Sequence, residues 1–220
     1  MRLEAVEVEE FMSLATRSLR GGGVDELARA AATRWTPRQL SPLLQQEQVE
    51  VRKLACLVLA SIGDHRAVGS LTAALRDSEA TVSQLAEQAL WSIWFRDGSH
   101  EAQIPFRRGL EEMSENKLDD AVTSFREASV IDPEFTESFN QCATAHYLAQ
   151  RWVESIELCE KVLERQRAHF GAMAGLGHAH LQMGNFAEAS RWYRHALKIH
   201  PRMHTVAHAL SRIDCCLERV

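Results

Sequence analysis

Residues 177–201 read GHAHLQMGNFAEASRWYRHALKIHP, and this stretch decides the fold of the second half of the chain. Ala189, Tyr193 and Ala196 stand in it at helical spacing, and Gly184-Asn185 interrupts the helical pattern. The same kinds of residue return upstream at a constant offset of 34 in the numbering. The matching sets are Gly109, Ala143 and Gly177; Ala121, Ser155 and Ala189; Phe125, Cys159 and Tyr193; and Ala128, Val162 and Ala196. This period predicts a structural unit that is repeated three times.

Each of these units is predicted to be a pair of antiparallel helices. Small residues at corresponding places let the two helices approach closely, and the ring or thiol of the second helix fills the remaining space. Asn116 and Gly184 mark the turn inside the first and the third unit. Pro133 and Pro201 end two of the units, because proline cannot continue a helix.

The three units resemble tetratricopeptide repeats. The third unit matches best and the first nearly as well, whereas in the middle unit Cys159 replaces the aromatic residue and Arg167 replaces the proline. A further helix follows with the apolar stripe Val206, Leu210, Ile213 and Leu217, as a terminal cap would have. The resemblance implies repeats over about 102–135, 136–169 and 170–203 within residues 99–204, and a capping helix over 205–220.

The first half of the chain has a different period. Residues 51–62, VRKLACLVLASI, match residues 82–93, VSQLAEQALWSI, at an offset of 31. At the same offset upstream, Leu40 and Leu44 correspond to Leu71 and Leu75. Each unit is therefore predicted to be a shorter helix, a break and a longer helix, and its apolar face must stack on its neighbours to be buried.

These units resemble the short HEAT-like repeats of bilin-lyase-type proteins. Val51, Arg52 and Ala55 carry the resemblance together with Ile62-Gly63-Asp64, although the second unit has Ser83 in place of the arginine. The resemblance implies a HEAT-like array over 24–98. Before it, Val6, Phe11, Leu14 and Leu19 predict an amphipathic helix over 1–20, and three glycines predict a flexible link over 21–23. The fold class implied by both families is all-α: an α-solenoid of stacked helix pairs wound as a right-handed superhelix.

Composition and charge exclude several classes of protein. The net charge is −5, with 25 Lys and Arg against 30 Asp and Glu, and no basic stripe is present, which argues against binding of nucleic acid. The longest apolar run, residues 54–62, is about half of the ~20 residues that a membrane-spanning helix needs. The five cysteines are odd in number and form no Cys-x-x-Cys pair, which predicts reduced thiols and a cytoplasmic location.

The reactive side chains do not form a recognisable catalytic motif. No phosphate-binding Gly-x-x-x-x-Gly-Lys sequence occurs, and Ile104 stands where a His-Glu-x-x-His zinc motif starting at His100 would need its second histidine. His204 and His208 share a helix face, but Cys215 lies ~10 Å further along the helix axis, so one metal ion cannot bind all three. The sequence therefore predicts no enzyme, no metal site and no cofactor.

In tetratricopeptide arrays the first helix of each unit lines a concave groove that binds a partner. The resemblance places nine residues of this chain there: Phe106, Leu110, Met113, Asn140, Thr144, Tyr147, Ala174, His178 and Leu181. Phe106 and Tyr147 are the expected aromatic anchors, and Asn140 and Thr144 are expected to bond a peptide backbone. Phe106 and Leu110, with Gly171 and Gly175, occupy places that in some family members hold a carboxylate clamp of Lys, Asn and Arg, so that chaperone-binding role is not expected.

The sequence thus predicts a non-enzymatic scaffold or adaptor that binds a peptide or helix of a partner protein, without nucleic acid or membrane. Three alternatives stay open. Residues 1–20 could fill the groove themselves. The first half could act as a bilin-lyase-like factor in assembling a chromophore protein, and the chain could also be a structural subunit that associates with itself.

Overall fold

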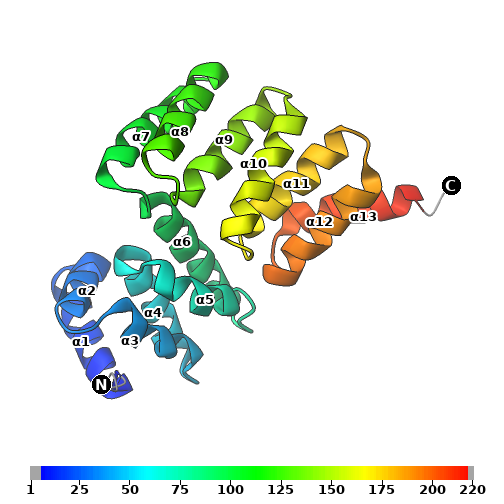
Figure 1. The fold of residues 1–220 in the computed structure, drawn as a ribbon. Coiled ribbons are helices and arrows are strands. Elements are labelled where there is room, and N and C mark those ends of the chain that lie inside the picture. The colour runs from blue at the N-terminus through cyan, green and yellow to red at the C-terminus, as the bar shows by residue number, and fades with distance from the viewer. Residues whose placement is uncertain (1–5, 218–220) are drawn as a thin grey trace. The chain divides into compact units, whose positions relative to one another are not determined.

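The computed structural model describes residues 6–217, apart from the side chains of residues 216 and 217, and every regular element in that range is a helix (Figure 1). Successive helices pack in pairs, so the predicted all-α architecture of stacked helix pairs is confirmed. The chain divides into two compact units, residues 1–95 and 96–220, and each is described by itself. The right-handed superhelix remains a prediction.

Unit 1 begins with a helix at the place where the amphipathic pattern predicts one, and residues 1–5 of that prediction lie outside the described part of the chain. Phe11 and Leu14 are buried, whereas Leu19 is 42% exposed and does not belong to the packed face. The three glycines expected to form a flexible link instead end one helix, make a one-residue turn and start the next. The elements are α1 (Val8–Gly21), α2 (Gly23–Ala32), α3 (Pro37–Leu40), the 3-10 helix η1 (Ser41–Gln45), α4 (Val49–Ile62), α5 (His65–Ala74) and α6 (Ala80–Arg96).

The sequence period of the first half corresponds to equivalent positions in the core of unit 1. Helices α4 and α6 start one period apart, at Val49 and Ala80, and η1 and α5 supply the shorter helices before them. Five of the corresponding apolar pairs are almost completely buried in both copies: Leu40 and Leu71, Leu44 and Leu75, Val51 and Val82, Ala55 and Ala86, and Leu59 and Leu90. Leu54, Leu85 and Ile62 are half-buried. Because both copies bury the same positions, the sequence pattern identified the packed face of each longer helix.

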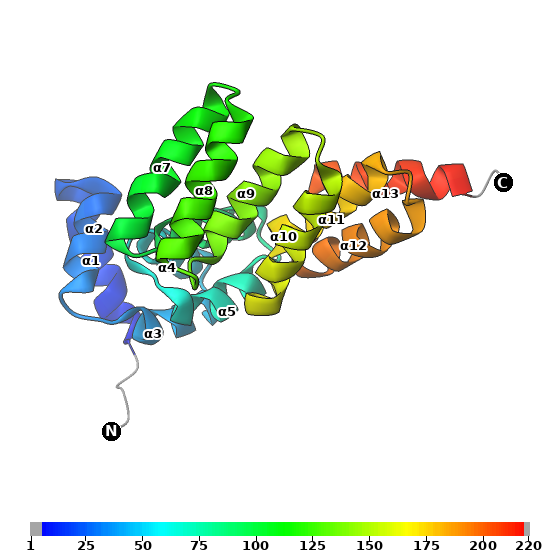
Figure 2. The same cartoon turned by 45° about the horizontal axis from the view of Figure 1, so that its top comes forward.

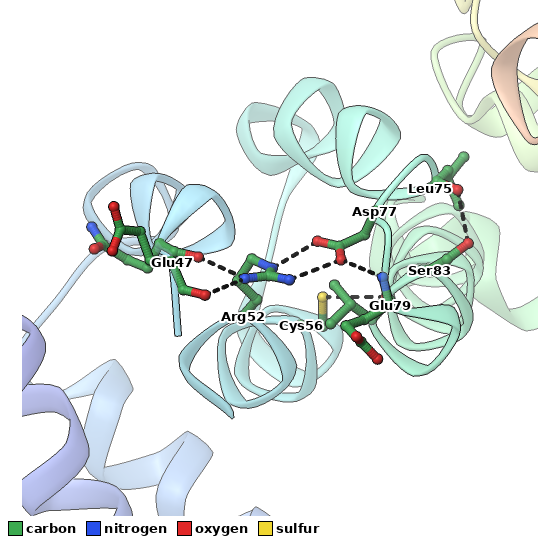
Figure 3. Close-up of polar contacts among 9 residues, drawn as sticks. Glu47, Arg52, Cys56, Leu75, Asp77, Glu79 and Ser83 are labelled. Carbon is green, nitrogen blue, oxygen red and sulfur yellow. Dashed lines mark hydrogen bonds and ion pairs between the residues drawn. The ribbon is translucent and has the colours of Figure 1, made fainter. Parts of the chain in front are cut away.

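Arg52 ties two loops of unit 1 together (Figure 3). Its Nε and Nη2 donate hydrogen bonds to the two carboxylate oxygens of Asp77, at 2.7 and 2.9 Å. Its Nη1 donates to the backbone carbonyls of Gln46 and Glu47, at 2.8 and 2.9 Å. The Asp77 carboxylate also accepts a hydrogen bond from the amide of Glu79. The arginine therefore joins the turn before α4 to the turn after α5 through a two-pronged ion pair, the strong form of this interaction.

Unit 2 consists of three antiparallel helix pairs and a terminal helix (Figure 2). The first helices of the pairs are α7 (His100–Ser114), α9 (Thr136–Leu148) and α11 (Phe170–Gln182), and the second helices are α8 (Leu118–Ile131), α10 (Trp152–Arg165) and α12 (Phe186–Ile199). The last helix, α13 (His204–Leu217), packs on α12. Its predicted stripe is buried at Val206 and Ile213; Leu217's side chain and residues 218–220 lie outside the described part.

Glycine and a large ring pack together between the helices of two pairs. A Cβ atom added to Gly109 would lie 2.8 Å from the Phe125 ring, and one added to Gly177 would lie 2.4 Å from the Tyr193 ring. Real Cβ contacts are longer than this, so only glycine allows each ring its place. The expectation that a small residue and a ring let the two helices approach closely is therefore confirmed at both pairs.

The turn within each helix pair uses a left-handed backbone conformation at the same repeat position. The φ angles are 61° at Asn116, 60° at Gln150 and 76° at Gly184, and successive members of this set are one repeat apart in sequence. Asparagine and glycine adopt this conformation readily, as expected for the first and third turns. Glutamine does not adopt the left-handed conformation readily, so the turn of the middle repeat forms in spite of Gln150.

Candidate functional site: the first-helix face of unit 2

The first helices of unit 2 lie on the inner side of its curve. Helix α7 packs on α9 and α9 on α11, in addition to the contacts within each pair, and no comparably close packing joins α8 to α10. Helices that approach one another more closely than their partners do must lie on the inner side of a bent array. This face is the candidate binding surface, and it holds all nine residues that the sequence places in a groove.

The nine residues separate by depth in the same way in all three repeats. Phe106, Asn140 and Ala174, which occupy the same position in successive repeats, are all buried. The remaining six are only half-buried and reach the surface; we call them the inner-face row: Leu110, Met113, Thr144, Tyr147, His178 and Leu181. The structure therefore offers a partner six of the nine predicted residues.

The prediction that Phe106 is an exposed anchor is wrong. Its side chain is 1% exposed, and its ring lies 4.6 Å from the ring of Phe135 and 5.7 Å from that of Phe125, measured between centroids. Phe135 directly precedes α9, the first helix of the next repeat, so the aromatic cluster joins the first two helix pairs. Phe106 fixes the spacing of α7, α8 and α9 and cannot contact a partner without unfolding.

Asn140 also differs from its predicted role, because it belongs to a buried polar cluster that sequence reasoning missed. The Glu137 carboxylate is completely buried and accepts hydrogen bonds from the side-chain amides of Asn140, at 2.9 Å, and Gln141, at 2.6 Å. Its other oxygen lies 3.1 Å from Nε2 of the equally buried His169. The amide of Asn140 is thus held inside the protein and is not available to a peptide backbone. Thr144 lies nearer the surface, and its hydroxyl donates to the Asn140 carbonyl.

The tautomer of His169 follows from its second contact. Its Nδ1 accepts a hydrogen bond of 3.0 Å from the backbone amide of Ala172, so this nitrogen carries no proton. Nε2 therefore carries the proton and donates a hydrogen bond to the Glu137 carboxylate. In this way His169 caps the start of α11 and at the same time connects that helix to α9. The available sequence signal was that Glu137 lies one helical turn before Asn140 and therefore shares its helix face.

Around Tyr147 and His178 the inner-face row is linked by hydrogen bonds. The side-chain amide of Gln182 donates to the Tyr147 hydroxyl at 3.3 Å, and Nδ1 of His178 lies 2.7 Å from the hydroxyl of the buried Tyr193. The rings of Tyr147 and His178 are 6.2 Å apart. Burial lowers the pKa of His178 and raises that of Tyr193, so both groups are neutral near pH 7. The centre of the row is thus polar, uncharged and held in place.

A pocket lies beside the end of the inner-face row. It has a volume of about 310 Å³ and is lined by Leu181 and Gln182 at the end of α11, Phe186 at the start of α12, and Ala209, Arg212 and Ile213 on α13. Leu181 belongs both to the row and to the pocket wall. No sequence pattern indicated this pocket, because its walls come from three helices whose residues follow no common period.

The described residues contain no metal-ligand cluster, and three of their cysteines are buried thiols. No group of three or more His, Cys, Asp or Glu within residues 6–217 could hold a metal ion. Burial raises the pKa of the thiols of Cys56 and Cys159 to about 12, so both stay protonated and unreactive. In the same range, no helix is both long and apolar enough to cross a bilayer. The prediction that the chain needs no cofactor remains a prediction.

Comparison with known proteins supports the repeat assignment in the second half. Residues 146–213 match the family model described as tetratricopeptide repeat. No curated protein matches the chain significantly.

Two of the similar solved structures are tetratricopeptide domains. One is the first such domain of Spaghetti (RPAP3) bound to the HSP90 peptide SRMEEVD; it is 19% identical with a TM-score of 0.53, and the match covers 55% of this chain and 95% of that one. The other is the Sgt2 domain from Aspergillus fumigatus, at 16% identity and a TM-score of 0.53, covering 55% of this chain and 82% of that one. At these identities the likeness concerns the fold alone: the C-terminal half of this chain has the fold of a tetratricopeptide domain, and residues 146–213 match the model of that repeat.

Proposed function

We propose that the chain is a non-enzymatic adaptor whose inner-face row binds an extended peptide or a helix of a partner protein. The observation that carries the proposal is the repeated pattern of depth on α7, α9 and α11. In each repeat one residue of the first helix is buried in the core, and two further residues of that helix are half-buried and reach the surface in the inner-face row. A rigid surface of this kind loses little conformational entropy on binding. The peptide that occupies the Spaghetti domain is consistent with such a use of this fold.

The contacts available to a partner are mainly apolar. Leu110, Met113 and Leu181 offer aliphatic surface, and Tyr147 offers a ring whose hydroxyl is already hydrogen-bonded. Tyrosine is among the residues that contribute most to interface energies, so Tyr147 replaces Phe106 as the principal anchor.

The proposal is tested by selecting binders from a displayed library of random dodecapeptides on the full chain. The dissociation constants of the selected peptides are then measured against the double variant Met113→Ala/Tyr147→Ala. We expect at least a tenfold weakening, because both changes remove contact area at the row. Val130→Ala/Val153→Ala removes two exposed apolar side chains from second helices and should leave binding unchanged. If the row variant binds every selected peptide as wild type does, or if no peptide is selected, the proposal fails.

We further assign residues 24–98 to a HEAT-like array, residues 99–204 to three tetratricopeptide repeats and residues 205–220 to a cap. The contacts of Arg52 support the HEAT-like assignment, because the arginine of one unit binds the aspartate of the next. Arg52→Lys keeps the charge but loses the two-pronged geometry, and we expect a loss of about 2 kcal/mol in the free energy of unfolding. Lys53→Arg, at an exposed pair with Glu50, is the control. Equal stability of the two variants would count against a structural role of Arg52.

The thiols are consistent with a reducing, cytoplasmic location, which we also propose. Cys56, Cys142 and Cys159 are buried and free, each in a different place in the core. Extracellular domains commonly oxidise such residues to disulfides.

A further inference from the structure

The pocket between α11, α12 and α13 exists because the last helix packs differently from the first helices before it. Helix α9 packs on α11 as well as on α10, whereas α13 packs chiefly on α12. Space is therefore left between the end of α11 and the second half of α13. The pocket occupies that space, with a volume of about 310 Å³. This lies at the lower end of the range of roughly 300–1,000 Å³ found for ligand sites, which suits one large side chain better than an extended cofactor.

The walls of the pocket are mainly apolar, and part of this apolar surface is exposed to water, which is unfavourable. Leu181, Ala209 and Ile213 form the interior, and Phe186 stands at the pocket with 44% of its surface exposed. An exposed phenylalanine beside an apolar pocket is stabilised when a second apolar group covers it and removes both surfaces from water.

The charge at the pocket is positive. Arg212 is the one charged residue among the six described residues that line it, and none of the six is acidic. The nearest acid in sequence, Asp214, is paired with Arg194 at 2.8 Å. One turn before Arg212 stands the exposed His208, which is not acidic, so the acid nearest to Arg212 along the described part of α13 is the already paired Asp214. The complementary group on a partner is a carboxylate.

The pocket is continuous with the inner-face row. Leu181 belongs to both, and Gln182, which lines the pocket, donates its hydrogen bond to Tyr147 in the row. A chain segment lying on the row therefore reaches the pocket without crossing the backbone of α11.

We propose that this pocket receives a large apolar side chain of the partner segment bound on the row, and that an Asp or Glu next to that side chain pairs with Arg212. This inference rests on the proposed function and adds the chemistry of the ligand: an apolar residue beside an acidic one, placed where the segment passes α13. The aliphatic or aromatic side chain supplies the buried area, and the carboxylate fixes the direction in which the segment lies.

The test uses the peptides selected on the full chain from the random dodecapeptide library. We expect them to share a large apolar residue within two positions of an Asp or Glu. Ala209→Phe fills the pocket and Arg212→Glu reverses its charge, and each should weaken binding at least tenfold. Arg167→Glu makes the same charge change at an exposed residue outside the pocket and should alter the dissociation constant less than twofold.

A charge swap keeps the test valid even if Ala209→Phe fails to fold. Replacing the acidic residue of a selected peptide by Lys should weaken its binding to wild type and restore its binding to Arg212→Glu. Peptides that lose binding to Met113→Ala/Tyr147→Ala but keep it with both pocket variants would overturn this inference and leave the proposed function standing. Selected peptides without an acidic residue would also overturn it. A dimer of wild type that light scattering detects, and that Ala209→Phe abolishes, would overturn it too, because the pocket would then hold a second copy of the chain.

Discussion

Glu137 lies on α9 and His169 caps the start of α11, so their completely buried side chains join two successive helix pairs. A buried carboxylate is costly unless hydrogen bonds replace its water, and here three side chains do so. His169 uses both ring nitrogens, one for the amide of Ala172 and one for Glu137. The middle repeat, whose sequence is the most degenerate of the three, therefore has buried polar contacts to the start of α11 in addition to its apolar cluster of Ala143, Cys159 and Val162.

Replacing Glu137 by Gln should show how much this cluster contributes. The amide that replaces the carboxylate presents two N–H donors to groups that are themselves donors, so at least one buried donor is left without an acceptor. We expect the free energy of unfolding to fall by about 3 kcal/mol, measured by urea denaturation. Glu134→Gln, at an exposed residue of the preceding turn, should change it by less than about 0.5 kcal/mol. Similar values for the two variants would show that the cluster is not stabilising.

Gln150 offers a prediction of the opposite sign. Its φ of 60° is unfavourable for a residue with a Cβ atom, whereas glycine adopts it freely. Against this gain stands the greater freedom of glycine in the unfolded chain. We expect Gln150→Gly to stabilise the protein by up to about 1 kcal/mol, and Gln150→Ala to leave stability nearly unchanged. A rise in the urea midpoint with alanine alone would contradict this account.

At the scale of the helix pair, the close approach of two helices depends on glycines that accept a ring. Gly177 sits against Tyr193 and Gly109 against Phe125, and in both pairs the ring occupies the volume that a methyl group would need. The helix itself would be more stable with alanine, by roughly 0.5–1 kcal/mol for each position. Packing between helices therefore outweighs the preference of the single helix at these positions.

Two glycine-to-alanine variants separate these effects. Gly177→Ala should destabilise the protein by about 2 kcal/mol, because the new methyl group meets the Tyr193 ring at 2.4 Å and the helices must separate. Gly69→Ala, inside α5 with no atom within 4 Å of the added Cβ, should stabilise it by about 0.5–1 kcal/mol. Thermal unfolding followed by circular dichroism gives both signs in one experiment. If both substitutions shift the midpoint in the same direction, packing at Gly177 is not the controlling factor.

Periodicity in the sequence predicted which helices pair and which of their faces are buried, but not how deep each residue lies. Phe106 on α7 and Tyr147 on α9 were both predicted for the groove face of a first helix. Phe106 is nevertheless buried, because the ring of Phe135, just before α9, packs against it. The separation of Phe106 and Phe135 in the sequence differs from the repeat period, so the periodic pattern does not predict their contact. The Glu137–His169 pair and the pocket at α13 were missed for the same reason, since each depends on side chains unique to one repeat.

At the scale of the whole molecule, histidine is the side chain whose ordinary pKa lies nearest to neutral pH, and the chain has ten. The net charge of −5 counts them as neutral, so protonating all ten would change it to +5. Burial lowers the pKa of His146 and of His178, and the cations Arg151 and Arg126 lower that of His146 further.

The sign of the pH dependence follows from these two groups. Below the ordinary histidine pKa of about 6.5, the imidazoles of His146 and His178 bind protons more readily in the unfolded chain than in the folded one. Their contribution to the free energy of unfolding is therefore fully present above that pH and is lost as the pH falls. Between pH 7.5 and 5.5, the free energy of unfolding should therefore decrease more steeply for wild type than for His146→Gln/His178→Gln. The control His204→Gln/His208→Gln changes two exposed histidines and should follow wild type, measured by urea denaturation at each pH. If all three curves run parallel, exposed groups and not these two buried imidazoles set the acid sensitivity of the protein.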